Sequence, residues 1–236
     1  DAADTGQENT AIGHQALTAD TKGNRNVAIG HGSLVTQNFT SSTSVYNTAV
    51  GYNAGNAVTT GTSNTLIGGL AGDAITTGTS NTAVGKSAIG GNTTGDFNSA
   101  LGHGALLSNT TADNNTAVGY LSLNLNTTGV NNVAVGSLAL DANTTASNNT
   151  AVGSAALSAN TTGTANTALG KESLALTTTG SNNTAVGKGC LVSNTTGAFN
   201  TALGTSALDN NTTANNNVAI GYAAMDANTT GASNVA

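Results

Sequence analysis

The sequence predicts an all-β protein, a single-stack parallel β-solenoid of about 13 to 14 coils, and three observations lead to it. An asparagine precedes a small-apolar-glycine phrase every 17 residues along the 236-residue chain. The consensus of one unit, N-T-A-V-G-x-x-A-L-x-x-N-T-T-G-x-N, is rich in Thr, Val, Gly and Asn, which are poor helix formers. Seventeen residues are too few for a helical hairpin, whereas short strands joined by tight turns fit this length.

Composition agrees with a thin core. Charged residues make up 7% of the chain and aromatic residues 3%, and Trp and Pro are absent. Such a chain has too few bulky side chains to fill a globular core, but stacked coils gain most of their order from backbone bonds between neighbouring coils. The composition therefore favours the solenoid once the period is recognised.

The period predicts one continuous solenoid over residues 1–236. Counting the first Asn of each unit as position 1, every interval is 17 residues except that from Asn26 to Asn47, which is 21. We expect the extra residues, about four, to form an insertion loop within residues 37–46. The asparagines at position 1 are expected to stack and hydrogen-bond along the axis as a ladder. This ladder comprises Asn9, Asn26, Asn47, Asn64, Asn81, Asn98, Asn115, Asn132, Asn149, Asn166, Asn183, Asn200, Asn217 and Asn234.

Two strands and two turns are expected in each coil. Positions 2 and 4 of the first strand share a face, and position 4 is always Val, Ile or Leu, so we expect this face to point inward. A second strand is expected around position 9, usually Leu. The Gly at position 5 marks one corner, and the N-T-T-G phrase marks the other, where Gly129, Gly163 and Gly197 suit a left-handed conformation.

Position 3 would then point away from the core, although it is Ala in every unit but that of Leu66. A small apolar residue recurring on an outer face predicts a surface that another subunit covers. The alternative is that close packing of coils alone excludes larger groups. The expected subunit interface comprises Ala83, Ala100, Ala117, Ala134, Ala151, Ala168, Ala185, Ala202 and Ala219.

The N-T-A-V-G and N-V-A-I-G phrases, at Asn115 to Gly119 and Asn217 to Gly221 for example, resemble the N-S-V-A-I-G motif of the head domain of YadA-like trimeric autotransporter adhesins. The likeness recurs over nearly the whole chain, although these repeats are slightly longer than the family's and N-T-T-G is not its usual second half. The resemblance implies a left-handed parallel β-roll and a homotrimer. It also implies that Val133, Val135, Val218 and Ile220 fill the interior, with Ala134 and Ala219 on the other face. Arrays of this kind are similar to segments of phage or cell-surface fibres as well.

Several classes of function are disfavoured. The net charge is −6 and the pI about 4.6, and the few Lys and Arg are scattered along the sequence, so we expect no nucleic-acid partner. A single cysteine, Cys190, is expected to be a small packed residue. No apolar run approaches the roughly 20 residues of a membrane span. His14, His31 and His103 all fall at position 6, where adjacent rings would stack, and Asp73, Asp141, Asp209 and Asp226 fall at position 10 as solvated charges. Neither set predicts a catalytic or metal site, and no cofactor is expected.

Two further patterns involve the N-T-T phrase. It matches the N-glycosylation sequon, and the candidate acceptors are Asn92, Asn109, Asn126, Asn143, Asn160, Asn194, Asn211 and Asn228. Its Thr pairs, such as Thr93 with Thr94, are also reminiscent of an ice-binding solenoid. Adjacent Thr residues on a strand point to opposite sides, however, which disfavours a two-rowed hydroxyl surface.

The sequence thus predicts a non-enzymatic structural or adhesive fibre, secreted or displayed at the cell surface, that assembles with copies of itself and contacts a host-surface or matrix receptor. The start at Asp1 without Met is consistent with a removed signal peptide. The chain stops inside its motif at Asn234-Val235-Ala236 with no capping element, so either the chain is a fragment or another subunit caps it by stacking end to end, and an end-to-end filament is the alternative function. An ice-binding protein is the further alternative.

Overall fold

The computed structural model describes residues 6–236 and contains strands and turns but no helix within that range. The chain divides into two compact units, residues 1–115 (unit 1) and 116–236 (unit 2). Unit 1 contains β1 Thr10–Ile12, β2 Gly23–Asn24, β3 Val27–Ile29, β4 Thr43–Ser44, β5 Thr48–Val50, β6 Thr65–Ile67, β7 Thr82–Val84 and β8 Ser99–Leu101. Unit 2 contains β9 Thr116–Val118, β10 Val133–Val135, β11 Thr150–Val152, β12 Thr167–Leu169, β13 Thr184–Val186, β14 Thr201–Leu203 and β15 Val218–Ile220.

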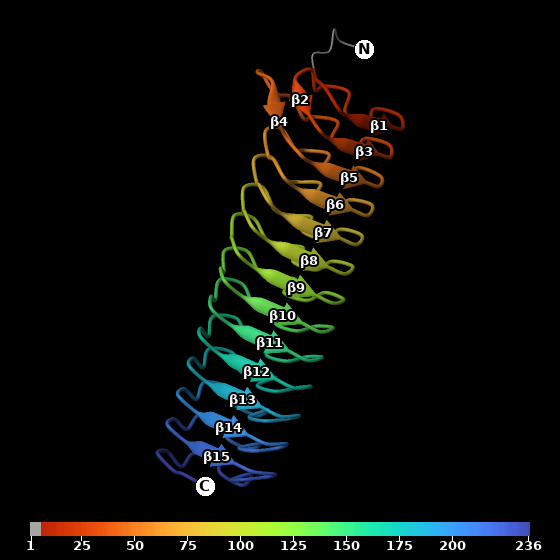
Figure 1. The fold of residues 1–236 in the computed structure, drawn as a ribbon. Helices are drawn as coiled ribbons and strands as arrows, with labels where there is room; N and C mark the ends of the chain where they lie inside the picture. Colours follow the sequence, from red (N-terminus) through yellow and green to blue (C-terminus); the bar gives the residue numbers. More distant parts are fainter. Residues whose placement is uncertain (1–5) are drawn as a thin grey trace. The chain divides into compact units, whose positions relative to one another are not determined.

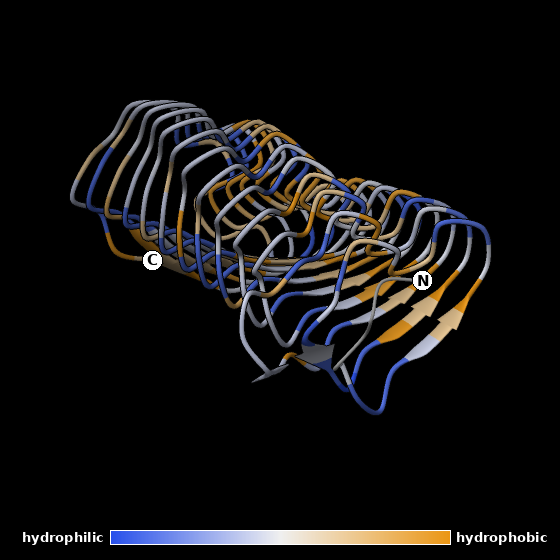
Figure 2. Ribbon diagram, turned by 90° about the horizontal axis from the view of Figure 1, so that it is seen from above, coloured by the Kyte–Doolittle hydropathy of each residue, from blue (hydrophilic) through white to orange (hydrophobic). Residues whose placement is uncertain are grey.

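Each unit is a parallel β-solenoid with one three-residue strand per coil, and the strands stack in register (Figure 1). In unit 2, Ala134 of β10 lies opposite Ala151 of β11, and Val135 opposite Val152. In unit 1, β3 pairs with β5 in the same register despite the 21-residue interval. Figure 2 shows hydrophobic and hydrophilic residues recurring at the same places in successive coils. The all-β parallel solenoid and its 17-residue repeat are confirmed.

The second strand expected around position 9 is absent from the regular coils that the structure describes. That segment is a turn in which positions 7 and 9 both have left-handed backbone, as at Leu138 (φ 57°) and Leu140 (φ 54°). Left-handed conformations are rare for branched residues. Here the conformation lets the chain reverse while the side chain of position 9 still points into the coil, where Leu140 is fully buried.

The predicted faces of the first strand are reversed. Ala134 and Ala219 are fully buried inside their coils, whereas Ile220 is 60% exposed and Val133 and Val135 are only half-buried. The family resemblance implied that the interior contains the side chains of Val133, Val135, Val218 and Ile220. This expectation is therefore wrong. The interior of a 17-residue coil is narrow, so only a methyl group fits between the strand and the Leu at position 9. The larger side chains at positions 2 and 4 face outward.

One coil pair shows this size limit directly. Leu66, the exception at position 3, is fully buried, and it lies beside Gly55 and Gly72, the two exceptions at position 9. A Cβ built on Gly72 would lie 2.7 Å from Leu66 Cδ2 and 2.8 Å from Ile75 Cδ1. The large residue on the strand thus occupies the space that a leucine fills elsewhere, so positions 3 and 9 share one interior.

The two glycine corners differ. Gly119 at position 5 has a φ of 133°, and a Cβ there would meet the Gly136 carbonyl oxygen at 2.6 Å, so conformation and close coil stacking both require glycine. The left-handed conformation expected for Gly129, Gly163 and Gly197 is wrong, since none of them has positive φ. The left-handed residue of that corner is at position 17, often Asn, which tolerates it well.

The insertion within residues 37–46 is partly ordered by a buried carboxylate. Asp20 accepts hydrogen bonds from Gln37 Nε2 at 2.6 Å and from the Gly23 backbone N–H at 2.9 Å. Gln37 Oε1 in turn accepts from Asn47 Nδ2 at 2.8 Å. The extra residues add β4, which pairs in parallel with β2. The insertion is therefore built onto the coil as a second short sheet as well as a loop.

Candidate functional site

The position 1 asparagines form hydrogen-bonded ladders inside each unit. Asn149 is typical: its backbone N–H donates to Asn132 Oδ1 at 3.0 Å, and its own Oδ1 accepts from the Asn166 N–H at 2.9 Å. Its Nδ2 donates to the Gly163 carbonyl, also at 2.9 Å. Each fully buried amide thus binds one coil to the next and closes its own coil, as expected for the ladder.

A second amide ladder occupies position 12, which sequence reasoning assigned to a surface corner. Asn109 Nδ2 donates to Asn92 Oδ1 at 3.0 Å, and Asn143 Nδ2 to Asn126 Oδ1 at 2.8 Å. A glycan on a folded coil needs an exposed, free Nδ2. Seven of the eight sequon asparagines are fully buried, namely Asn92, Asn109, Asn126, Asn143, Asn160, Asn194 and Asn211, and Asn228 Nδ2 donates to Asn211. Their prediction as accessible acceptors is therefore wrong.

The alanines expected at a subunit interface do not reach the surface. Their outward orientation is wrong, because position 3 lies against the Leu at position 9 inside the same coil. The buried set is Ala83, Ala100, Ala117, Ala134, Ala151, Ala168, Ala185, Ala202 and Ala219.

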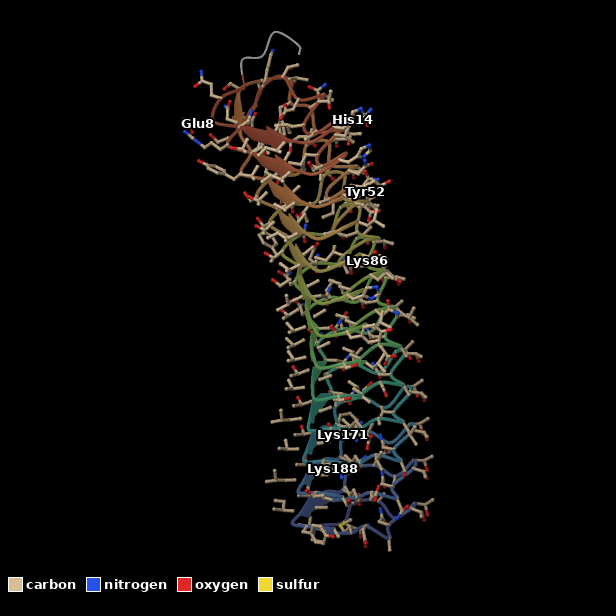
Figure 3. The ribbon with its side chains drawn as sticks, turned by 90° about the vertical axis from the view of Figure 1, so that its right-hand side faces the viewer. Glu8, His14, Tyr52, Lys86, Lys171 and Lys188 are labelled. Carbon is tan, nitrogen blue, oxygen red and sulfur yellow. The ribbon has the colours of Figure 1, made fainter. Side chains whose placement is uncertain are left out.

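The outward side of the same strands is a regular uncharged surface, which we call the strand face. It consists of positions 2 and 4, mostly Thr followed by Val, Ile or Leu. In unit 1, Leu101 is 51% exposed, and in unit 2, Leu203 is 46% exposed. Figure 3 shows a row of side chains projecting from the strands of unit 2 on the left. The strand face carries no charged residue in β1, β3 or β5 to β15.

A different set of exposed side chains follows position 6, and we call it the ridge. In unit 1 the His14 and His31 rings stack with centroids 5.1 Å apart, and Tyr52 stacks on His31 at 5.5 Å. The sequence predicted the stacking of the two histidines. Figure 3 shows His14, Tyr52 and Lys86 following one side of unit 1. The ridge comprises His14, His31, Tyr52, Gly69, Lys86 and His103 in unit 1, and Tyr120, Ser137, Ser154, Lys171, Lys188, Thr205 and Tyr222 in unit 2.

The basic residues of the chain are therefore not scattered, contrary to expectation. Three of the four lysines and all three histidines are on the ridge, while no Asp or Glu is. A count of charge by repeat position would have found this signal in the sequence. The two remaining basic residues lie beside the insertion, where Arg25 pairs with Glu8 at 2.7 Å.

The position 10 aspartates are less solvated than expected. Burial raises the pKa of Asp73 and of Asp141, and for Asp141 hydrogen bonds from its own N–H and that of Ala142 partly offset this effect on the pKa. Asp141 Oδ1 and Asn124 Oδ1, at position 10 of the preceding coil, are buried without a hydrogen-bond partner within the described residues. The unpaired buried oxygens at position 10 therefore lower the stability of the fold. The described position 10 carboxylates do not face one another in a cluster.

Cys190 is fully buried at position 8 in place of Ala, as expected for a packed residue, and burial raises the pKa of its thiol to about 11. A thiol with so high a pKa is protonated and unreactive near neutral pH. Residues 6–236 contain no group of three His, Cys, Asp or Glu side chains arranged to hold a metal ion.

The Thr pairs of the N-T-T phrase divide their roles. Thr127 Oγ1 donates to the Thr144 carbonyl of the next coil at 2.9 Å, so the hydroxyl of the first Thr links neighbouring coils. The second Thr of each pair, such as Thr128 or Thr145, is exposed. The exposed hydroxyls therefore form one row at this corner.

No helix in residues 6–236 is long and apolar enough to cross a bilayer. In comparisons with known proteins, no family model, no curated protein and no solved structure matches this chain.

Proposed function

We propose that this chain is a non-enzymatic, extracellular structural fibre protein that associates with copies of itself through the strand face, as a homotrimer. The exposed, uncharged strand face carries the proposal. Large contiguous apolar surfaces on soluble proteins generally mark interaction sites. The Val, Ile and Leu side chains of position 4 face outward because the coil interior is narrow. Only another surface packed against them can remove them from water.

A second copy fits this surface better than an unrelated protein. Strands in a parallel sheet are spaced about 4.8 Å apart, so the strand face presents a rigid array with that period. An identical strand face has the same period and the same lack of charge, and its side chains match over many coils. The resemblance of the N-T-A-V-G phrase to trimeric adhesin heads is the ground for proposing three copies, although the interior that it implied is reversed in this chain.

The internal construction suits an exposed fibre. The amide ladders and stacked strands fix the coils without a disulfide, since the chain has one cysteine, and few Lys or Arg residues are present as protease targets. These features support a secreted or surface-displayed role in which the protein acts as a stiff element that presents its exposed side chains to a receptor.

Two lysines on the strand face test the proposal. We expect V135K/V152K to lower the sedimentation coefficient to that of a single chain, because an interface would have to bury two unpaired charges in neighbouring coils. The matched control is S137K/S154K, which places the same charges on the exposed ridge of the same two coils. The control should sediment like the unmodified protein. Association through the strand face would be contradicted if both variants dissociate to the same extent, or if neither variant dissociates.

An end-to-end filament is separated from a lateral assembly by electron microscopy. Lateral association through the strand face gives discrete particles of uniform length. Filaments many chains long, retained in V135K/V152K, would favour the alternative function.

Ice binding is a second candidate because Thr recurs at position 2 of the strand face, at the spacing of the stacked strands. The bulky aliphatic residues at position 4 and the single Thr row at the other corner make it the weaker one. Thermal hysteresis by the unmodified protein that is lost in T150K/T167K would support it, and its absence would remove it.

A further inference from the structure

We propose that the ridge binds an acidic polysaccharide, a polymer of uronic acid sugars, along successive coils of a unit. The first observation is the segregation of charge. Six of the eight basic or histidine side chains of the chain lie at one repeat position of seventeen, and none of the eleven Asp and Glu residues does. In a protein of net charge −6, this arrangement leaves one lysine on the ridge of unit 1 and two lysines in adjacent coils of unit 2 as local positive charges, with no carboxylate in the same column.

The ammonium groups of the ridge are accessible to a ligand. Lys86, Lys171 and Lys188 are exposed. Within residues 6–236, Lys171 pairs with Glu172 at 3.2 Å, and no ion pair engages Lys86 or Lys188. Lys171 and Lys188 occupy adjacent coils, about 4.8 Å apart along the stack. A polymer with a carboxylate on each sugar offers an acceptor to each of these two lysines.

The aromatic members of the ridge favour a sugar over a simple anion. His14, His31 and Tyr52 form one continuous stack in unit 1, and Tyr52 is 58% exposed. Tyr222 on the unit 2 ridge is 84% exposed. Because the stacked rings cover one another's faces, they present edges, where ring nitrogens and the Tyr hydroxyl can hydrogen-bond sugar hydroxyls. The highly exposed ring of Tyr222 can in addition pack against sugar C–H groups. Serine and threonine fill most of the remaining ridge positions and add further donors and acceptors.

The low density of charge argues against nucleic acid. Binding to a phosphate backbone depends on many Lys and Arg contacts at once, whereas the ridge has at most two lysines in succession and the molecule as a whole is acidic. The ridge is a different column from the strand face, so this proposal does not require that copies associate.

Affinity electrophoresis in gels containing sodium polygalacturonate tests the proposal. We expect the unmodified protein to be retarded by this probe, and not by its fully methyl-esterified form, which has the same sugars without charge. K171A/K188A should bind about fivefold more weakly, as expected for the loss of two exposed ion pairs. T179E/T196E lowers the net charge by the same two units on an exposed column of the same coils, so it should bind more tightly than K171A/K188A.

A gain of function provides the second arm. S137K/S154K extends the ridge by two lysines and should tighten binding, whereas V135K/V152K adds the same charges elsewhere and should tighten it less. The proposal is overturned if the unmodified protein ignores polygalacturonate, if the esterified polymer binds equally, or if T179E/T196E loses as much affinity as K171A/K188A. Tighter, ridge-dependent binding of single-stranded DNA would overturn the assignment of the ligand class.

Discussion

At the scale of single residues, asparagine is the residue that holds this fold together. Two columns of buried amides, at positions 1 and 12, hydrogen-bond within and between coils, except that Asn160 Oδ1, which precedes Thr177 in its column, has no partner within the described residues. Asn suits this role because one side chain both donates and accepts, so identical residues can pair along an axis. The repeat therefore keeps Asn at positions where a globular core would have Leu.

The ladder makes a sharp prediction for one residue. Asn149→Ala leaves the Asn166 N–H without its partner and removes one of the two donors to the Gly163 carbonyl, which keeps Asn160 Nδ2. A buried unpaired group costs about 1–3 kcal/mol, so we expect the free energy of unfolding in urea to fall by about 1–3 kcal/mol. The control is Asn148→Gly, at an exposed position whose left-handed backbone glycine adopts without strain. If the two variants are equally stable, the ladder contributes little.

At the scale of one coil, the period could be read from the sequence but the direction of the strand could not. The intervals between asparagines predicted the stack, the register and the position 1 ladder, because each depends only on repetition. In the alternating phrase V-A-V, either the Val side chains or the Ala side chain can face the interior of the coil. Which face is buried depends on the width of the coil, a tertiary property. The joint exception of Leu66 with Gly55 and Gly72 was the available signal that positions 3 and 9 share one interior.

That exception also provides a test of the packing. We expect Gly72→Leu to destabilise unit 1 by about 1–3 kcal/mol through overpacking against Leu66, and Leu66→Ala to cost about 2–5 kcal/mol by leaving a cavity. The double variant L66A/G72L restores the usual pairing of Ala with Leu and should recover most of the stability, since leucine has this backbone conformation at position 9 of other coils. Additive losses in urea unfolding would show that the two sites do not share space.

At the scale of the whole molecule, the same repetition that builds the coils sorts the surface. Apolar residues recur at position 4, hydroxyls at position 14 and cations at position 6. The sequence did not reveal the strand face as a surface, because its residues were expected inside. Once the small residues fill the interior, the large ones must face outward, and we propose that the surface they form associates with other copies.

The mass of the unmodified protein in solution is the most direct test of that role, and multi-angle light scattering across a range of concentrations measures it. The account predicts a stable species of three times the 22.7 kDa chain mass. A 22.7 kDa monomer that persists at high concentration, with its strand face open to water, would contradict it.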